Sequence, residues 1–375
     1  MNKKQIACAV LALVVAAGAA GTGGFFIGRN SAESAYRSEH ELNIRLNRSD
    51  LDGLGEIKGT IYVTGHKSPD SDTVGSSIAY ADLLQQLGYD AKAVVLDNIN
   101  RETEYILNKA GMDVPEILDD ASGKNMVLVD HSEYTQSVNG LENATIISII
   151  DHHNDGAVTT GNQIIYDARP LGSTATIIWL RYRNYGLEPD KQIAAVMLGA
   201  ILSDTDNLIS VSTTFADREA LKVLSDIADI HDTDTFYEEM HKAKLSYDGM
   251  ADEDIFFIDY KEYEAGGTKY CIGIIEVYDE ESARDMAERM KNVMPYVLKV
   301  TGMDMAFAKI SASREDTFIN YIVPSDDTAA QVIKSAFGDK AVPDGVSYVF
   351  RESMSRKKVM VPAITEVLEA NPKKS

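Results

Sequence analysis

Residues 60–73 read T-I-Y-V-T-G-H-K-S-P-D-S-D-T, and this stretch decides the fold. Residues 61–63 are β-branched and aromatic, as in a strand; turn residues follow them, and an apolar helical pattern begins at Val74. In an open α/β sheet, such a strand-to-helix loop is where ligands bind. Three side chains of this loop suit a hard or borderline metal ion: His66, Asp70 and Asp72. Taken alone, they fit a solvated turn with an aspartate helix cap better than a metal site.

Two further apolar runs end in the same residue types. Residues 126–129 lead into Asp130 and His131, and residues 144–150 lead into D-H-H at 151–153. Taken singly, Asp130 is also typical of a turn or helix cap, and a histidine pair of a surface loop. The carboxyl ends of parallel strands meet at one edge of a sheet, so three such ends predict a metal site there.

The pattern of apolar residues predicts two α/β domains. At 375 residues and 45% hydrophobic content, the chain exceeds the size at which one core usually divides. In the first half we expect helices at 79–87, 101–110, 172–183 and 191–202, and a further strand at 91–96. After a charged helical stretch at 217–245 and a hinge at 246–249, we expect strands at 254–260, 270–276, 305–310 and 317–323, with helices at 281–293 and 328–337.

Two helix ends add polar groups to the first half. Gly172–Thr176 opens a helix with hydroxyl residues, which fits either a plain cap or an anion held by free N–H groups. Asp204 follows the last turn of an apolar helix and is either solvated or held beside the metal site. The residue pattern leaves both pairs of alternatives open.

The net charge indicates which partners the protein can bind, and the N-terminal residues indicate where it is located. A net charge of -22 repels nucleic acid and anionic substrates, so phosphate chemistry here requires bound cations and a local basic patch. The cysteines, Cys8 and Cys271, form neither a disulfide framework nor a zinc-type cluster. Lys3 and Lys4 precede an apolar run at 6–28, which predicts a membrane anchor at 1–30 with an extracytoplasmic catalytic body; a cleaved signal peptide is the alternative. Residues 31–57 form a tether or short helix in this interpretation.

The ordered motifs resemble those of the DHH phosphoesterase superfamily and, within it, the family II inorganic pyrophosphatases. They are G-H-K-S-P-D-S-D-T, V-D-H at 129–131, D-H-H at 151–153, P-L-G-S-T-A-T at 170–176, I-L-S-D-T at 201–205 and S-R-K-K at 355–358. The resemblance implies a parallel-sheet, Rossmann-like DHH domain at 58–245, a smaller mixed α/β substrate-binding domain (DHHA2-like) at 250–375, and an active site in the cleft between them.

The resemblance also implies two Mn²⁺ or Co²⁺ ions, with Mg²⁺ arriving with the substrate. It places the first ion on His66, Asp72, Asp130 and Asp204, and the second on Asp70, Asp130, His152 and Asp204. A hydroxide bridging the two ions would attack phosphorus. The implied residues that bind substrate phosphate are His153, Lys261, Arg356 and Lys357. Without the resemblance, residues 355–358 also fit a solvated basic turn.

The expected function is therefore hydrolysis of pyrophosphate to two phosphates, with Asp70, Asp130, His153, Arg356 and Lys357 as the catalytic residues. Ser68 and Val359 depart from the asparagine and glutamine that the family usually has. The alternatives are a DHH-type exopolyphosphatase, a nucleotide phosphodiesterase, or a phosphate sensor without catalysis. The resemblance also allows a homodimer through a sheet edge of the first domain.

Overall fold

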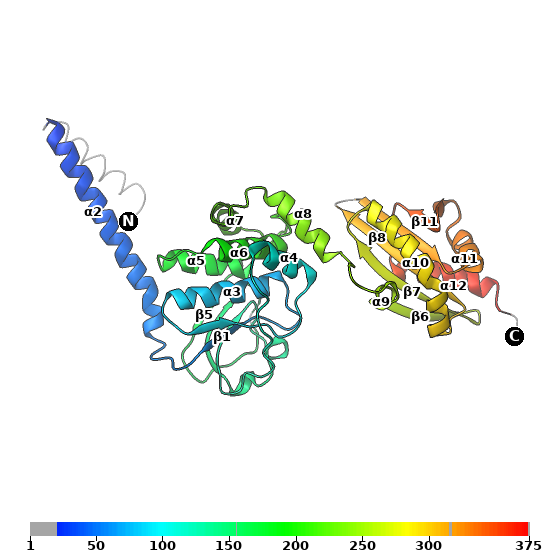
Figure 1. The fold of residues 1–375 in the computed structure, drawn as a ribbon, viewed down its shortest axis with the longest axis horizontal. Coiled ribbons are helices and arrows are strands. Elements are labelled where there is room, and N and C mark those ends of the chain that lie inside the picture. The colour runs from blue at the N-terminus through cyan, green and yellow to red at the C-terminus, as the bar shows by residue number, and fades with distance from the viewer. Residues whose placement is uncertain (1–20, 155, 315–316, 374–375) are drawn as a thin grey trace. The chain divides into compact units, whose positions relative to one another are not determined.

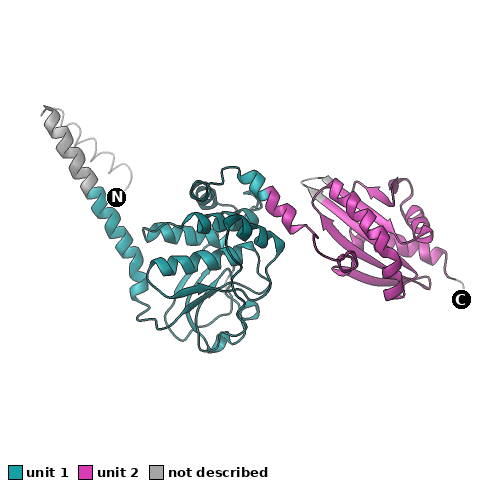
Figure 2. Cartoon of the chain, viewed as in Figure 1, with its two compact units in different colours: residues 1–237 teal, residues 238–375 magenta. Residues whose placement is uncertain are grey.

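The computed structural model describes residues 21–154, 156–314 and 317–373, which form two compact units (Figure 1). Unit 1 extends to Tyr237 and unit 2 begins at Glu238, within helix α8 (Figure 2). The expected α/β class, a parallel sheet followed by a mixed sheet, is confirmed.

Unit 1 contains one parallel sheet in the order β2-β1-β3-β4-β5. Its strands are β1 (Ile61–Thr64), β2 (Ala91–Ala93), β3 (Asn125–Val129), β4 (Thr145–Asp151) and β5 (Ile165–Ala168). The helices are α2 (Gly21–Asp52), α3 (Ser71–Gln86), α4 (Arg101–Ala110), α5 (Thr174–Asn184), α6 (Lys191–Asp204), α7 (Phe215–Ala228) and α8 (Thr233–Lys244). In this strand order, the chain reverses direction across the sheet between β1 and β3, so a crevice opens at their carboxyl ends.

The two faces of this sheet are covered differently. Helices α3 and α5 lie against one face, and α4, α6 and α7 pack behind them (Figure 1). Loops and two short 3₁₀ turns, Tyr134–Gln136 and Leu141–Asn143, cover the other face, where Met126, Leu128 and Ile149 are buried. The buried β3 and β4 thus fix the position of the loops that follow them.

Unit 2 is a six-stranded sheet in the order β10-β11-β9-β8-β7-β6, in which only β7 and β8 pair in parallel among the described residues. Its strands are β6 (Tyr260–Ala265), β7 (Thr268–Val277), β8 (Met305–Arg314), β9 (Thr317–Pro324), β10 (Val342–Asp344) and β11 (Ser347–Phe350). Helices α9 (Asp252–Phe257) and α10 (Glu280–Thr301) pack on one face, and α11 (Asp327–Phe337) and α12 (Val361–Ala370) on the other.

The strand predicted at 254–260 is wrong, because residues 252–257 form helix α9. Three acidic residues fill its first turn, where they stabilise the helix dipole, while Ile255 and Phe256 are buried against the sheet. A short apolar run has no period long enough to distinguish a strand from a buried helix.

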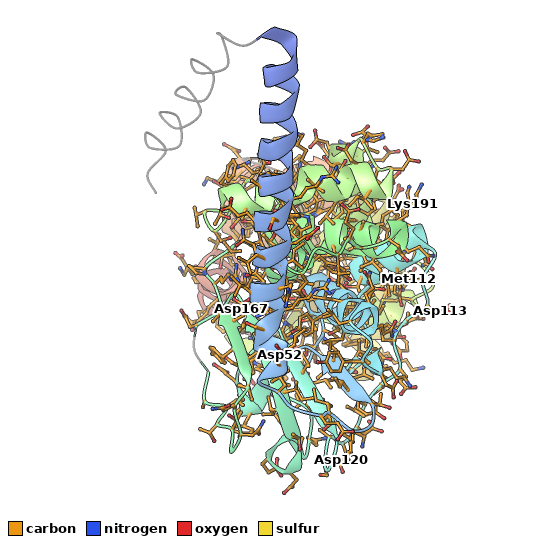
Figure 3. All side chains as sticks on the ribbon, turned by 90° about the vertical axis from the view of Figure 1, so that its left-hand side faces the viewer. Asp52, Met112, Asp113, Asp120, Asp167 and Lys191 are labelled. Atoms are coloured by element: carbon orange, nitrogen blue, oxygen red, sulfur yellow. The ribbon has the colours of Figure 1, made fainter. Side chains whose placement is uncertain are left out.

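The predicted membrane location is also wrong. Most of the expected anchor, residues 1–20, lies outside the described residues, and in the part that is described no helix is long and apolar enough to cross a membrane. Residues 21–52 instead form one helix, α2, which ends at Asp52 and contacts α5 of the same unit (Figure 3). There the Arg48 guanidinium donates to the carbonyl of Tyr185, whose hydroxyl donates to Asp50 at 2.9 Å.

Candidate metal centre

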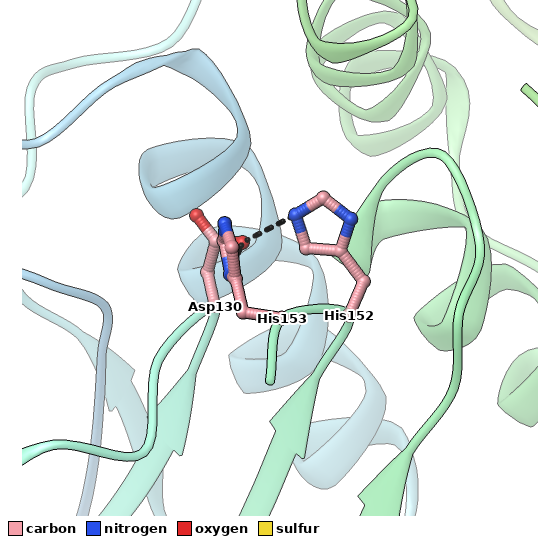
Figure 4. A group of neighbouring side chains, drawn as sticks. All are labelled: Asp130, His152 and His153. Atoms are coloured by element: carbon pink, nitrogen blue, oxygen red, sulfur yellow. Dashed lines mark ion pairs between the residues drawn. The ribbon is translucent and has the colours of Figure 1, made fainter. Parts of the chain in front are cut away.

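Asp130 lies at the middle of the site. It follows β3 directly, is 1% exposed, and has a left-handed backbone conformation with φ of 62°. A non-glycine residue in this conformation costs about 1–3 kcal/mol and persists where the surrounding structure enforces it. Here the Asp130 N–H donates to the carbonyl of Ile150 at 2.9 Å, and the turned backbone directs the carboxylate toward the histidines that follow β4 (Figure 4).

One group of atoms that could bind a metal ion lies around Oδ2 of Asp130. His66 Nε2 lies 3.5 Å from Asp130 Oδ2 and 3.4 Å from Asp70 Oδ2. His66 Nδ1 lies 2.7 Å from the carbonyl of Lys67. A carbonyl only accepts, so Nδ1 carries a proton, and Nε2 is the nitrogen that faces the two carboxylates and would bind a metal ion once its own proton is displaced.

A second group of such atoms lies around Oδ1 of Asp130. His152 Nε2 lies 3.4 Å from Asp130 Oδ1, 3.3 Å from Asp204 Oδ2 and 4.0 Å from Asp72 Oδ2. This grouping differs from the partition that the resemblance implies: Asp70 lies with His66, and Asp72 lies with His152. Asp130 belongs to both groups, and Asp204 joins only the second.

His152 shows that a cation fits this group. Its Nδ1 lies 3.1 Å from the carbonyl of Leu171 and therefore carries the proton. Its Nε2 is buried and makes no hydrogen bond to the described residues, although three carboxylates surround it. Burial opposes protonation of His152, yet its contact with Asp130 and the charge of Asp72 raise its pKa to about 10, so this position favours a cation, either a proton or a metal ion. An imidazole nitrogen among carboxylate oxygens is a donor set for a divalent metal ion, and carboxylate-rich sets suit manganese and magnesium.

The start of helix α5 holds Asp72 in place. Asp72 is fully buried, and its carboxylate accepts from Ser173 Oγ at 2.7 Å, Thr174 N at 2.7 Å and Ala175 N at 3.0 Å. Both interpretations of Gly172–Thr176 hold: Ser173 caps α5 by accepting from Ala175 N at 3.1 Å, and the free N–H groups also hold an anion, which is the carboxylate of Asp72.

Two threonines hold Asp130. Thr73 Oγ1 donates to Asp130 Oδ2 at 2.7 Å, and Thr174 Oγ1 donates to Oδ1 at 3.0 Å. Asp70 caps helix α3 by accepting from Thr73 N at 2.9 Å through Oδ1, which leaves Oδ2 facing His66. Hydrogen bonds within the protein thus fix the orientation of the carboxylates of Asp70, Asp72 and Asp130.

The pKa values show the same excess of buried negative charge. Burial, and then the charge of Asp130, raises the pKa of Asp72 to about 7. Burial and the charges of Asp72 and Asp130 raise the pKa of Asp204 to about 10. Burial opposes protonation of His66, yet its contacts with Asp130 and Asp70 raise its pKa to about 11. In metal-free protein, protons therefore compensate the charge that a cation would compensate.

The remaining two histidines have different surroundings. His131 is buried, with Nδ1 2.9 Å from the carbonyl of Val129 and Nε2 2.8 Å from Ser137 Oγ, so both nitrogens are used within the fold. His153 is exposed, and Asp151 Oδ1 accepts from its Nδ1 at 3.0 Å, which raises the pKa of His153. His153 can therefore present a protonated ring to an anion.

The histidines and Asp130 line a cavity of about 750 Å³ in unit 1. Lys67 and Ser68 form part of its wall, and Ser68 has a left-handed φ of 55°. Asparagine, the residue usual in the family, tolerates this conformation better than serine does. The departure at Ser68 therefore falls on the backbone of the cavity wall.

Sequence reasoning missed two buried carboxylates beside the centre. Glu102 accepts from Ser71 Oγ at 3.2 Å and Ser203 Oγ at 3.0 Å, and so joins the helices that carry Asp72 and Asp204. Asp217 accepts from Gly172 N at 3.0 Å and thereby fixes the loop before Ser173. Only the three-dimensional contacts distinguish these residues from other acidic residues on charged helices.

The predicted phosphate-binding residues lie in unit 2. Lys261 is exposed on β6, and Lys357 is exposed on the helical turn Arg356–Met360. Arg356 is 9% exposed, and its guanidinium donates to the Asp259 carboxylate at 2.7 Å and the Asp259 carbonyl at 2.8 Å. Arg356 is thus anchored on one side by Asp259.

Comparisons with known proteins show the family of this chain. Residues 60–201 match the DHH family, N-terminal domain, and residues 238–367 match the DHHA2 domain. Manganese-dependent inorganic pyrophosphatases from Methanocaldococcus jannaschii and Methanothrix thermoacetophila are 36% and 35% identical; each alignment covers 81% of this chain and 97% of the relative. A solved structure from Methanococcus jannaschii, assigned to family II inorganic pyrophosphatases, is 34% identical with a TM-score of 0.51, and the match covers 82% of this chain and 99% of that one. The chain therefore belongs to the family II inorganic pyrophosphatases of the DHH superfamily.

Proposed function

We propose that this protein hydrolyses inorganic pyrophosphate to two phosphates and depends on manganese. The observation that carries the proposal is the arrangement at His152, whose buried Nε2 makes no hydrogen bond to the described residues and lies 3.3–4.0 Å from three carboxylates. The names of relatives that span the same two domains supply the substrate and the metal.

The ligand set accommodates two ions on opposite oxygens of Asp130. We assign one ion to His66, Asp70 and Asp130, and the other to Asp72, Asp130, His152 and Asp204. When bound, such a pair lowers the pKa of water and offsets negative charge on a phosphoryl group. Cobalt satisfies the same donors, and Mg²⁺ is expected to accompany the substrate.

The other residues of the chain have to bind and orient the phosphates. Protonated His153, held by Asp151, provides a charged donor beside the metal groups. Arg356 can make paired hydrogen bonds to phosphate oxygens, while Lys261 and Lys357 act as point charges. We retain residues 58–245 as the metal-binding domain and 250–375 as the substrate-binding domain.

Phosphate release tests the proposal. The full chain is loaded with Mn²⁺ and given pyrophosphate, tripolyphosphate or a cyclic dinucleotide, beside Asp130→Asn and a matched control, Asp113→Asn, which removes an exposed aspartate of unit 1. We expect rapid release from pyrophosphate, loss in Asp130→Asn and no change in Asp113→Asn. Preference for tripolyphosphate or the dinucleotide would favour another phosphoesterase, and binding of pyrophosphate without release would favour a sensor.

A further inference from the structure

Unit 2 contains a lysine that none of the motifs includes. Lys309 lies in the middle of β8, opposite Ile274 of β7 and Ile322 of β9. Lys261 of β6 lies opposite Ile272, two residues before Ile274 on β7. Side chains of paired residues share a face, and residues two apart on a strand return to it. Lys261 and Lys309 therefore project from the same face of the sheet.

This face is apolar where α11 and α12 pack on it and polar beyond them. Ile272 and Ile322 belong to the buried cluster under those helices. Further along β8, Ser311 pairs with Asn320 of β9, and both are buried. Buried polar side chains need hydrogen-bond partners, and Lys309, Ser311 and Asn320 partly supply them to one another.

The internal bonds hold Lys309 in one position. Lys309 Nζ donates to Ser311 Oγ at 2.7 Å, Ser311 Oγ donates to Asn320 Oδ1 at 3.1 Å, and Asn320 Nδ2 donates to the carbonyl of Glu352 at 2.8 Å. An ammonium group has three donors, and this chain of hydrogen bonds uses one of them. Lys309 is half-buried and forms no ion pair with a described carboxylate.

A second cation, Arg356, lies on the same part of the sheet: its guanidinium is 3.4 Å from the carbonyl of Ile272, the residue opposite Lys261 and two before the residue opposite Lys309. Burial lowers the pKa of Lys309, the carboxylate of Glu276 opposes that change, and the charge of Arg356 lowers the pKa further. Two neighbouring cations in a half-buried site repel each other; the carboxylate of Asp259 hydrogen-bonds to Arg356, and its charge also opposes the lowered pKa of Lys309. An anion with several oxygens satisfies the free donors of both side chains at once.

We propose that Lys309, oriented by Ser311, binds a phosphoryl oxygen of the phosphoanhydride substrate together with Arg356 and Lys261. The inference deepens the proposed pyrophosphatase function and rests on it for the identity of the anion. It adds a specificity-determining cation to the basic residues near the C-terminus. Lys309, Lys261 and Arg356 together provide three cationic side chains, so the site favours an anion with several oxygens over a neutral ligand.

The test uses the full chain loaded with Mn²⁺ and three variants. Lys309→Met removes the charge and keeps an unbranched apolar chain, and Lys309→Arg keeps the charge. Lys299→Met removes the same charge from an exposed position near the end of α10 and is the matched control. Calorimetry measures binding of methylenediphosphonate, a pyrophosphate analogue that is not hydrolysed, and kinetics with pyrophosphate measure KM and kcat separately.

We expect Lys309→Met to weaken methylenediphosphonate binding and raise KM by roughly tenfold or more, as loss of a hydrogen bond from a charged group does. Lys309→Arg should recover part of the loss, and Lys299→Met should match the parent protein. Unchanged binding and KM in Lys309→Met would overturn the inference, as would an equal loss in Lys299→Met. If the parent protein releases no phosphate, the proposed function fails, and the calorimetric comparison still decides the role of Lys309.

Discussion

Replacing Gly172 by alanine should loosen the metal centre without touching a ligand. Gly172 N donates to Asp217 at 3.0 Å, and the residues after Gly172 donate to the carboxylate of Asp72. A Cβ built at Gly172 would lie 2.7 Å from Thr205 Cγ2 and 2.9 Å from both Asp217 Cγ and Oδ2. All three distances are shorter than real contacts allow, so the loop has to move.

The expected losses of stability and of Mn²⁺ affinity follow from the contacts that this loop makes. Overfilling a tightly packed site costs about 1–3 kcal/mol of unfolding free energy. Displacing Thr174 N or Ala175 N from Asp72 disturbs a residue that orients a metal ligand, and such changes reduce metal affinity by roughly 10- to 100-fold. We therefore expect Gly172→Ala to be folded, less stable, and weaker in Mn²⁺ binding by that factor.

Calorimetric titration with Mn²⁺ measures the affinity, and thermal unfolding with and without the metal measures stability. Gly161→Ala is the matched control, because a Cβ at Gly161 meets nothing within 4 Å. The reasoning is refuted if Gly172→Ala binds Mn²⁺ as tightly as the parent protein while its stability falls, because the loop would then have no influence on Asp72.

Three further predictions concern protonation and individual side chains. The pKa values of Asp72 and Asp204, about 7 and about 10, exceed the ordinary 3.8, and that of His66, about 11, exceeds 6.5, so folded metal-free protein holds extra protons at neutral pH. The stability that a raised pKa provides is lost as pH rises from the ordinary pKa to the folded one, so the loss from Asp72 is complete near pH 7, and Asp204 and His66 cause the loss above it. Between pH 7 and 10 the stability in chelator should fall by about 1.4 kcal/mol per pH unit for each extra proton held, and Mn²⁺ should flatten the profile; a flat profile in chelator would contradict this. Ser68→Gly should raise the unfolding free energy by roughly 0.5–1 kcal/mol in denaturant titrations, because glycine removes left-handed strain at φ of 55° and loses some of the gain to chain entropy; lower stability would contradict it. His131→Ala should cost about 2–3 kcal/mol, because it leaves buried polar partners unpaired, while Mn²⁺ stoichiometry measured by metal analysis stays unchanged; loss of metal would make His131 a ligand.

The sequence was enough to predict where the site lies, because the order and parallel pairing of the strands bring its residues together. His66, Asp130 and His152 each follow a short apolar strand, and parallel pairing of β1, β3 and β4 places those ends side by side. The helix at 101–110 was predicted with its observed bounds, since Asn100 caps it and Gly111 ends it in a left-handed conformation.

The division of the ligands depended on local geometry that spacing does not encode. Asp70 is the N-cap of α3, so one of its oxygens turns back to Thr73 N and the other faces His66. Asp72 is in the first turn, and its carboxylate points to the start of α5, about a hundred residues away in sequence. Glu102 and Asp217 were missed for the same reason, because their partners are distant in sequence.

Other differences arose where an apolar or charged run fits two structures. Strand β5 has an alternating, half-exposed pattern and only four residues, Ile165–Ala168, so it carried little signal. The small residues at the start of α2 favoured a membrane anchor, yet the same helix continues into a charged second half. Helix α12 was not predicted; it directly follows the basic residues at 355–358 and has a proline in its first turn.

The most direct test of the metal assignment is the number of Mn²⁺ ions bound per chain, measured by calorimetry and metal analysis after dialysis. Asp130 offers one oxygen to each group of ligands, so the parent protein and Asp113→Asn should bind two ions, and Asp130→Asn should lose affinity for both. A parent protein that binds a single ion, or an Asp130→Asn variant that retains two, would contradict a centre built around the carboxylate of Asp130.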